Sequence, residues 1–241
     1  MGIPTELLER CWNDLYAGGR YAQEPPLRFT SRILALLRAE PELEAGRGLY
    51  VGCGNGRNFV PLTRAGLELH GMDVSEVALR VLAERVPEAA GRLVHADFQA
   101  FDAAEPFDYL VALQVFQHGA QEDVDAHFRR AAAVVRPGGL FFVRVNAPEC
   151  DIFFPYEPLD RNAHGGYSVL CTGGPKAGQP VHFFGRDELL ALTEPWFDVV
   201  EPPRELREER PPPRKGGWAQ WEAVFRRRPG GPAPQPMQEP Q

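Results

Sequence analysis

Three glycines, Gly52, Gly54 and Gly56, directly follow a short apolar strand. Because glycine has no Cβ atom, the backbone at such positions can turn sharply and let a ligand approach closely. A helix is expected over 59–65, and its first turn presents free backbone N–H groups and a partial positive charge. The sequence therefore predicts that the loop 52–58 holds an anionic group such as a carboxylate.

The spacing of these glycines differs from that of two phosphate-binding motifs. The dinucleotide fingerprint is Gly-x-Gly-x-x-Gly, whereas here the third glycine arrives one residue early and Arg57 stands in the last glycine's place. A Walker-type loop needs Gly-Lys-Ser or Gly-Lys-Thr, and neither follows. Taken alone, the glycine triplet could also be a tight packing turn.

Two acids stand at the ends of the next two predicted strands. Asp73 ends the second strand, about 20 residues after Gly52, where a carboxylate can accept both hydroxyls of a ribose. Asp97 and Phe98 end the third strand, where the carboxylate can accept from an adenine amino group and the ring can cover its face. Either acid alone could be a cap or turn residue. Together with the glycine loop they predict a ligand made of adenosine joined to an amino acid.

These motifs and their order resemble the class I S-adenosylmethionine-dependent methyltransferases. The resemblance rests on the run Gly-Cys-Gly-Asn-Gly-Arg-Asn at 52–58, on Gly-Met-Asp-Val-Ser at 71–75 and on the later landmarks at 97–98, 107–111 and 136–140. It covers roughly 47–145 and implies S-adenosylmethionine as cofactor. The implied cofactor-binding residues are Tyr16, Gly52, Cys53, Gly54, Asn55, Gly56, Asn58, Asp73, Val74, Asp97, Phe98, Leu113 and Gln114.

Two finer features narrow the resemblance. The Gly-Arg-Asn ending of the loop and the pattern Trp12-x-x-x-Tyr16 are similar to the tellurite-resistance and thiopurine-type branch, whose members act on small molecules. In that resemblance Tyr16 lies over the cofactor. One position departs from the family pattern: the acid that often precedes the first glycine by two residues is Tyr50 here, so its support of the loop is absent or replaced.

Strands that alternate with helices predict a doubly wound, mostly parallel α/β sheet with helices on both faces. The family resemblance adds a seven-stranded sheet whose last strand, 218–227, is antiparallel. We expect one domain over 1–228, preceded at 1–45 by a helical lid and interrupted at 146–184 by an irregular substrate loop. Residues 201–217 are expected to form an extended loop, and the Pro- and Gly-rich tail 229–241 to be disordered.

Methyl transfer is an in-line displacement from a sulfonium, and it needs a base only when the nucleophile arrives protonated. His118, shortly after the fourth strand, is the candidate base, although a structural or cofactor-proximal histidine is the favoured interpretation. Asn146, Tyr156 and His164 are the candidate substrate residues, with packing of the long loop as the alternative for the last two.

The formal net charge of -7 and pI near 5.5 argue against nucleic acid as a partner. The widely spaced cysteines suggest no metal site, and the lack of a signal peptide or membrane span predicts a soluble cytoplasmic protein. The predicted function is methylation of a small molecule on oxygen, nitrogen or sulfur. A nucleic-acid or protein methyltransferase and a non-catalytic S-adenosylmethionine-binding module are the alternatives, and the oligomeric state stays open.

Overall fold

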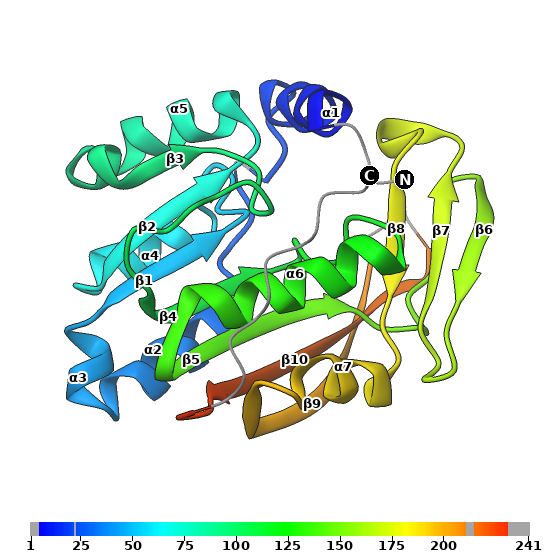
Figure 1. Cartoon of the computed structure of the whole chain (residues 1–241). Helices are drawn as coiled ribbons and strands as arrows, with labels where there is room; N and C mark the ends of the chain where they lie inside the picture. The colour runs from blue at the N-terminus through cyan, green and yellow to red at the C-terminus, as the bar shows by residue number, and fades with distance from the viewer. Residues whose placement is uncertain (1–4, 22, 211–214, 231–241) are drawn as a thin grey trace.

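The computed structural model describes residues 5–21, 23–210 and 215–230 of the 241-residue chain. Its main sheet has seven strands in the order β3-β2-β1-β4-β5-β10-β9 (Figure 1). The strands are β1 (Arg47–Val51), β2 (Glu68–Asp73), β3 (Leu93–His95), β4 (Phe107–Leu113), β5 (Val135–Asn146), β9 (Phe197–Glu209) and β10 (Gly217–Arg227). Strands β1 to β5 pair in parallel, and β10 is antiparallel to both its neighbours. The predicted fold class and the antiparallel last strand are thus confirmed.

Alternate residues of the central strands fill two separate apolar cores, as the period of two in a strand requires. Leu110 and Ala112 of β4 face one core, while Tyr109 and Val111 face the other. Both cores are buried because helices cover both faces of the sheet. This is why the central strands read as continuous apolar runs.

The helices divide between the two faces according to their buried side chains. Helices α2 (Arg28–Arg38), α4 (Phe59–Arg64) and α5 (Glu76–Arg85) pack on the face of Tyr109, and α6 (Gln121–Val134) and α7 (Arg186–Thr193) pack on the face of Leu110. The short α3 (Pro41–Glu44) precedes β1. Ser75 caps α5 by accepting from the backbone N–H of Ala78 at 3.1 Å.

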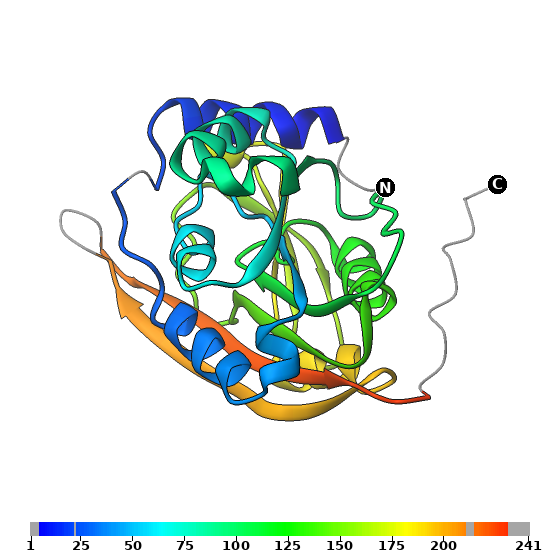
Figure 2. The same cartoon turned by 90° about the vertical axis from the view of Figure 1, so that its left-hand side faces the viewer.

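Helix α1 (Thr5–Ala17) lies apart from these layers, across the carboxyl ends of the strands and beside α5 (Figures 1 and 2). Its polar anchor is Asn13, whose Oδ1 accepts from the Ser75 hydroxyl at 2.7 Å. In a doubly wound sheet this end is where ligands bind. The position of α1 is therefore that of a cover over the ligand-binding end.

The segment 146–184 differs from the expected irregular loop, because it contains a second, antiparallel sheet in the order β6-β7-β8. The strands are β6 (Tyr156–Arg161), β7 (Tyr167–Cys171) and β8 (Pro180–Phe183), with a short 3-10 helix, η2 (Gly174–Lys176), between the last two. Prolines and glycines around these short strands hide the period-two pattern. This insertion is ordered by contacts with the main domain, which the local sequence does not reveal.

A buried polar cluster fastens the insertion to the main domain. The imidazole of His182 on β8 lies 3.0 Å from the Glu188 carboxylate of α7 and 2.8 Å from the Ser168 hydroxyl of β7. The same carboxylate accepts from the side chains of Gln121 on α6 and Asn162. We call these five residues the insertion clamp. Ser168, His182 and Glu188 are at most 2% exposed, so their role is to hold elements together.

The predicted extended loop 201–217 is wrong for most of its length, because β9 continues to Glu209. Pro202 and Pro203 are tolerated there since β9 is the edge strand, where a missing N–H breaks no second ladder. The predicted disordered tail lies almost wholly outside the described residues. Among the described residues, no helix combines the length and the apolar character needed to cross a membrane.

Candidate cofactor pocket and active site

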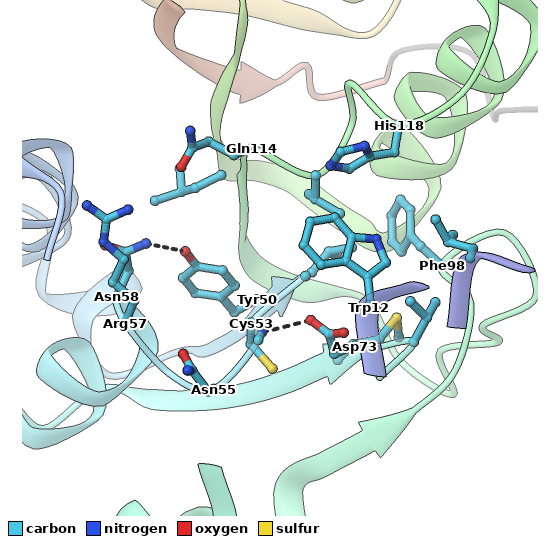
Figure 3. Close-up of a pocket in the computed structure, with 18 of the residues that line it drawn as sticks. Trp12, Tyr50, Cys53, Asn55, Arg57, Asn58, Asp73, Phe98, Gln114 and His118 are labelled. Carbon is cyan, nitrogen blue, oxygen red and sulfur yellow. Dashed lines mark hydrogen bonds between the residues drawn. The ribbon is translucent and has the colours of Figure 1, made fainter. Parts of the chain in front are cut away.

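A pocket opens at the carboxyl ends of β1, β2 and β4, beneath α1 (Figure 3). It contains about 960 Å³ of empty space, its open mouth included, which suits a small-molecule ligand. It is lined by the glycine loop, by Asp73, Asp97 and Phe98 at the ends of β2 and β3, and by Gln114 and His118 after β4. Segments far apart in the sequence therefore meet at one site.

The glycine loop is shaped for close approach by two residues with positive φ, Gly52 at 67° and Gly54 at 53°. A Cβ atom on Gly52 would lie 2.7 Å from the side chain of Val115, and one on Gly54 would lie 2.3 Å from the Tyr16 hydroxyl. Helix α1 thus rests directly on the loop through Tyr16. Any side chain at Gly54 would push α1 away or force the loop to move.

Asp73 is fixed at the end of β2 by backbone donors. Its Oδ2 accepts from the N–H of Gly54 at 2.7 Å (Figure 3), and its Oδ1 accepts from the N–H of Ser75 at 2.9 Å. Burial raises the pKa of this carboxyl to about 6, against the lowering effect of these two hydrogen bonds. Asp73 lines the pocket, and each of its carboxylate oxygens keeps a further lone pair that can accept from a ligand hydroxyl.

Asp97 and Phe98 follow β3 on the same side of the pocket. Asp97 accepts from the N–H of Gln99 at 2.8 Å and from the Thr5 hydroxyl of α1 at 3.3 Å. The buried Phe98 ring stacks on Phe116 with a centroid separation of 5.4 Å. The pair presents a carboxylate next to a rigid aromatic face.

Asn58 and Tyr50 brace the glycine loop by hydrogen bonds. They replace the support that an acid at position 50 gives in the family pattern. The Asn58 amide donates to the Tyr50 hydroxyl at 3.2 Å and accepts from the Leu27 N–H at 2.9 Å and the Thr30 hydroxyl at 3.0 Å. Asn55 likewise donates to the carbonyl of Arg20 at 2.9 Å. These two amides tie the loop to the chain around α2, so much of their hydrogen-bonding capacity is already used.

The wall after β4 combines a strained backbone with a buried imidazole. Gln114 is one of two described non-glycine residues with positive φ, at 60°, a conformation that is costly and concentrates at functional sites. His118 is buried against the edge of the Trp12 ring, with centroids 5.2 Å apart, and its Nδ1 has no hydrogen-bond partner among the described residues. Burial, followed by the charge of Lys176, holds the pKa of His118 well below its usual value.

The structure brings together nearly all predicted cofactor residues. Those that line the pocket are Tyr16, Gly52, Cys53, Gly54, Asn55, Asn58, Asp73, Val74, Asp97, Phe98, Leu113 and Gln114. Gly56 does not line it, because it packs against Leu82 and Val60 instead. The candidate base His118 also lines the pocket.

The three candidate substrate residues do not gather at this pocket. Asn146 is buried elsewhere and donates to the carbonyl of His182 at 3.5 Å. Tyr156 is 45% exposed on β6, and His164 is exposed in the turn before β7. None of the three is part of the pocket lining.

Several pocket residues were not predicted, notably Trp12, Tyr21, Arg57 and His127. His127 is buried and stacks on Phe116 at 5.0 Å, and burial lowers its pKa to about 4. Its position on the same helix face as Val124 and Phe128 is the signal that could have identified it. The place of Trp12 in the pocket could be predicted only if the packing position of α1 were known.

The comparison with protein families matches residues 49–139 to the family described as methyltransferase domain. The matched stretch runs from β1 through the glycine loop, Asp73 and Asp97 to the start of β5. Over this stretch, which is less than half of the chain, the sequence is similar to the methyltransferase domain family. Methyltransferases of this class use S-adenosylmethionine, as the glycine loop and the two acids predict.

Sequence relatives match less than half of this chain. A ubiquinone biosynthesis O-methyltransferase from Mesorhizobium japonicum is 35% identical over 112 residues, which are 44% of this chain and 43% of the relative. A namesake from Methylobacterium sp. (strain 4-46) is 41% identical over 107 residues, or 42% of each chain. The chain thus matches less than half the length of these relatives.

Solved structures extend the similarity to almost the whole fold. The 1,6-didemethyltoxoflavin-N1-methyltransferase of Burkholderia thailandensis, with bound S-adenosylhomocysteine, has a TM-score of 0.64 at 21% identity, covering 93% of this chain and 88% of that one. TehB from Haemophilus influenzae has a TM-score of 0.60 at 17% identity, covering 90% and 67%. At these identities the likeness concerns the fold alone.

The pocket has groups that suit S-adenosylmethionine. The Asp73 carboxylate, which lines the pocket, offers acceptors to the ribose hydroxyls. Phe98 offers an apolar face to the adenine. The residues present therefore fit this cofactor.

Proposed function

We propose that this chain transfers a methyl group from S-adenosylmethionine to a small-molecule acceptor. The observation that carries the proposal is the Asp73 carboxylate, buried at the end of β2 and held 2.7 Å from the N–H of Gly54. This geometry places ribose acceptors directly beside the glycine loop. S-adenosylmethionine, when bound, supplies an electrophilic methyl group and a neutral thioether leaving group.

The residues of this chain contribute binding, positioning and exclusion of water. The Gly52–Gly54 loop and Asp73 hold the two ends of the cofactor, and Tyr16 and Trp12 of α1 cover it. The strained Gln114 and buried His118 border the remaining space, where the acceptor must approach the methyl group in line. Holding the acceptor and the methyl group within reacting distance and in line supplies much of the rate enhancement.

The acceptor class rests on what surrounds the pocket and on the relatives. One relative is named for the biosynthesis of ubiquinone and one structural neighbour for the methylation of 1,6-didemethyltoxoflavin. Ubiquinone and 1,6-didemethyltoxoflavin are both small molecules. The net charge of -7 gives no support to a nucleic-acid acceptor. The four cysteines are free thiols, which supports a reducing, cytoplasmic location.

We propose that His118 shapes the pocket and does not act as the general base. An imidazole whose pKa lies well below its usual value is a weak base at neutral pH. Replacing His118 with alanine should therefore lower kcat by less than about 100-fold, the lower bound for losing a general base. Steady-state kinetics at saturating S-adenosylmethionine measure this. A larger loss that His118→Gln does not rescue would contradict it.

Cofactor binding should weaken in mild acid because it needs the ionised form of Asp73. The pKa of Asp73 is raised to about 6, so the carboxyl gains a proton as pH falls through that value and then accepts fewer hydrogen bonds. Below pH 6, affinity for S-adenosylhomocysteine should fall by up to about tenfold per pH unit. Calorimetry at several pH values tests this, with Asp73→Asn as the variant that should lack the dependence. An unchanged slope in that variant would refute it.

A screen for acceptors tests the proposed function. The purified protein is incubated with S-adenosylmethionine and small phenols, amines and thiols, and release of S-adenosylhomocysteine is followed. We expect turnover of at least one acceptor and its loss in Asp73→Ala. Cofactor binding without turnover of any member would favour the alternative, a non-catalytic S-adenosylmethionine-binding module.

A further inference from the structure

A lysine from the insertion, Lys176, contacts the tryptophan that lines the pocket next to His118. Lys176 ends the short helix η2, and its Nζ lies 5.3 Å from the centroid of the Trp12 ring. Trp12 in turn lies against His118, with centroids 5.2 Å apart. Trp12 and His118 line the pocket, so this row of contacts leads from the insertion to the pocket wall.

The ammonium of Lys176 has no carboxylate partner within the described part of the chain. The charged and titratable groups around it are the thiols of Cys150 and Cys171, the guanidinium of Arg20 and the imidazole of His118. Burial lowers the pKa of Lys176 to about 8, which is the direction expected for a cation without a counter-ion. The other cations at the pocket already have partners: Arg57, which lines it, pairs with Glu24 at 2.9 Å, and the guanidinium of Arg20 stacks on the Tyr21 ring.

Burying an ammonium even in part costs free energy unless an anion pairs with it. Its contact with Trp12 compensates only in part, since a cation–π contact is weaker than a paired charge. The contact also fixes where the ammonium lies, next to the wall that carries His118. An anion that reached Lys176 would have its remaining atoms beside that wall.

We infer that Lys176 is a specificity-determining residue that binds a carboxylate group of the methyl acceptor at the mouth of the pocket. The inference rests on the proposed function, because it assumes that the acceptor enters beside Trp12 and His118. It also gives the insertion a role: β7, η2 and β8 hold the lysine in place over α1. A small carboxylate would then be preferred to its uncharged counterpart.

The test uses the full chain saturated with S-adenosylhomocysteine. Benzoate, 3,4-dihydroxybenzoate and indole-3-acetate are titrated by calorimetry, each beside its primary amide. We expect at least one carboxylate to bind, and to bind about tenfold or more tightly than its amide. Lys176→Met should abolish this preference and Lys176→Arg should keep most of it. Lys215→Met, which removes the other lysine at an exposed position, should change nothing.

Equal affinity for acid and amide, no binding of any carboxylate, or an undiminished preference in Lys176→Met would each overturn the inference. S-adenosylhomocysteine must bind Lys176→Met as it binds the wild type, which also shows that the variant is folded. If S-adenosylhomocysteine fails to bind the wild type, the proposed function fails and the inference falls with it. Binding of S-adenosylhomocysteine without discrimination by charge overturns the inference alone.

Discussion

Replacing Asp73 with alanine is expected to weaken binding of S-adenosylmethionine by about 100-fold or more. The change removes two hydrogen bonds from the ribose to a charged acceptor, and bonds of that kind contribute about 1.5–3 kcal/mol each. It also leaves the N–H groups of Gly54 and Ser75 without their acceptor, so the loop loses its brace. Calorimetric titration with S-adenosylhomocysteine measures the effect directly.

The matched control is Asp198→Ala. Asp198 pairs with Arg228 on the surface at 2.7 Å, and its side chain is 61% exposed. Surface pairs of this kind contribute little, so cofactor affinity should stay within about twofold of the wild type. Circular dichroism should show both variants folded. If Asp73→Ala binds S-adenosylhomocysteine as tightly as Asp198→Ala does, Asp73 is not the ribose ligand.

Replacing Glu188 with alanine is expected to lower the free energy of unfolding by about 3 kcal/mol or more. The Glu188 carboxylate lies at the centre of the insertion clamp, and it is 2% exposed. It accepts from Gln121, Asn162 and the N–H of Gly185, and it lies 3.0 Å from the His182 imidazole. Alanine leaves these buried groups without a partner, which costs more than the lost bonds alone.

The control for this change is Glu194→Ala, on the exposed residue that caps the C-terminus of the same helix. Removing an acid at that end should leave stability unchanged or slightly higher. Chemical denaturation followed by fluorescence compares the two variants. A loss in Glu188→Ala no greater than in Glu194→Ala would show that the clamp contributes little to stability.

The parts that the sequence predicts well are those in which local pattern and global fold agree. Strand β4 (Phe107–Leu113) is apolar at every position except Asp108, because both faces of that strand are buried. The pocket residues could be predicted because the carboxyl ends of β1, β2 and β4 meet at one edge of a parallel sheet. Asp73 and the glycine loop follow from that geometry.

The parts that escaped prediction depend on contacts between distant segments. Tyr156 and His164 stand on or beside strands of an insertion whose order comes from the clamp, and the sequence shows neither the sheet nor the direction of their side chains. Trp12 enters the pocket only because α1 packs over Gly54, and Lys176 meets Trp12 only because the insertion folds back over α1. Contacts of this kind between distant segments produce no periodic pattern in the amino-acid sequence.

The central claim is that the pocket beneath α1 binds S-adenosylmethionine and thereby serves methyl transfer. Calorimetric titration of the wild-type chain with S-adenosylhomocysteine tests it most directly, with S-adenosylmethionine as competitor. We predict one-to-one binding with a dissociation constant in the range of about 1–100 µM, and displacement by S-adenosylmethionine. Absence of binding by both compounds at about 1 mM would contradict the account.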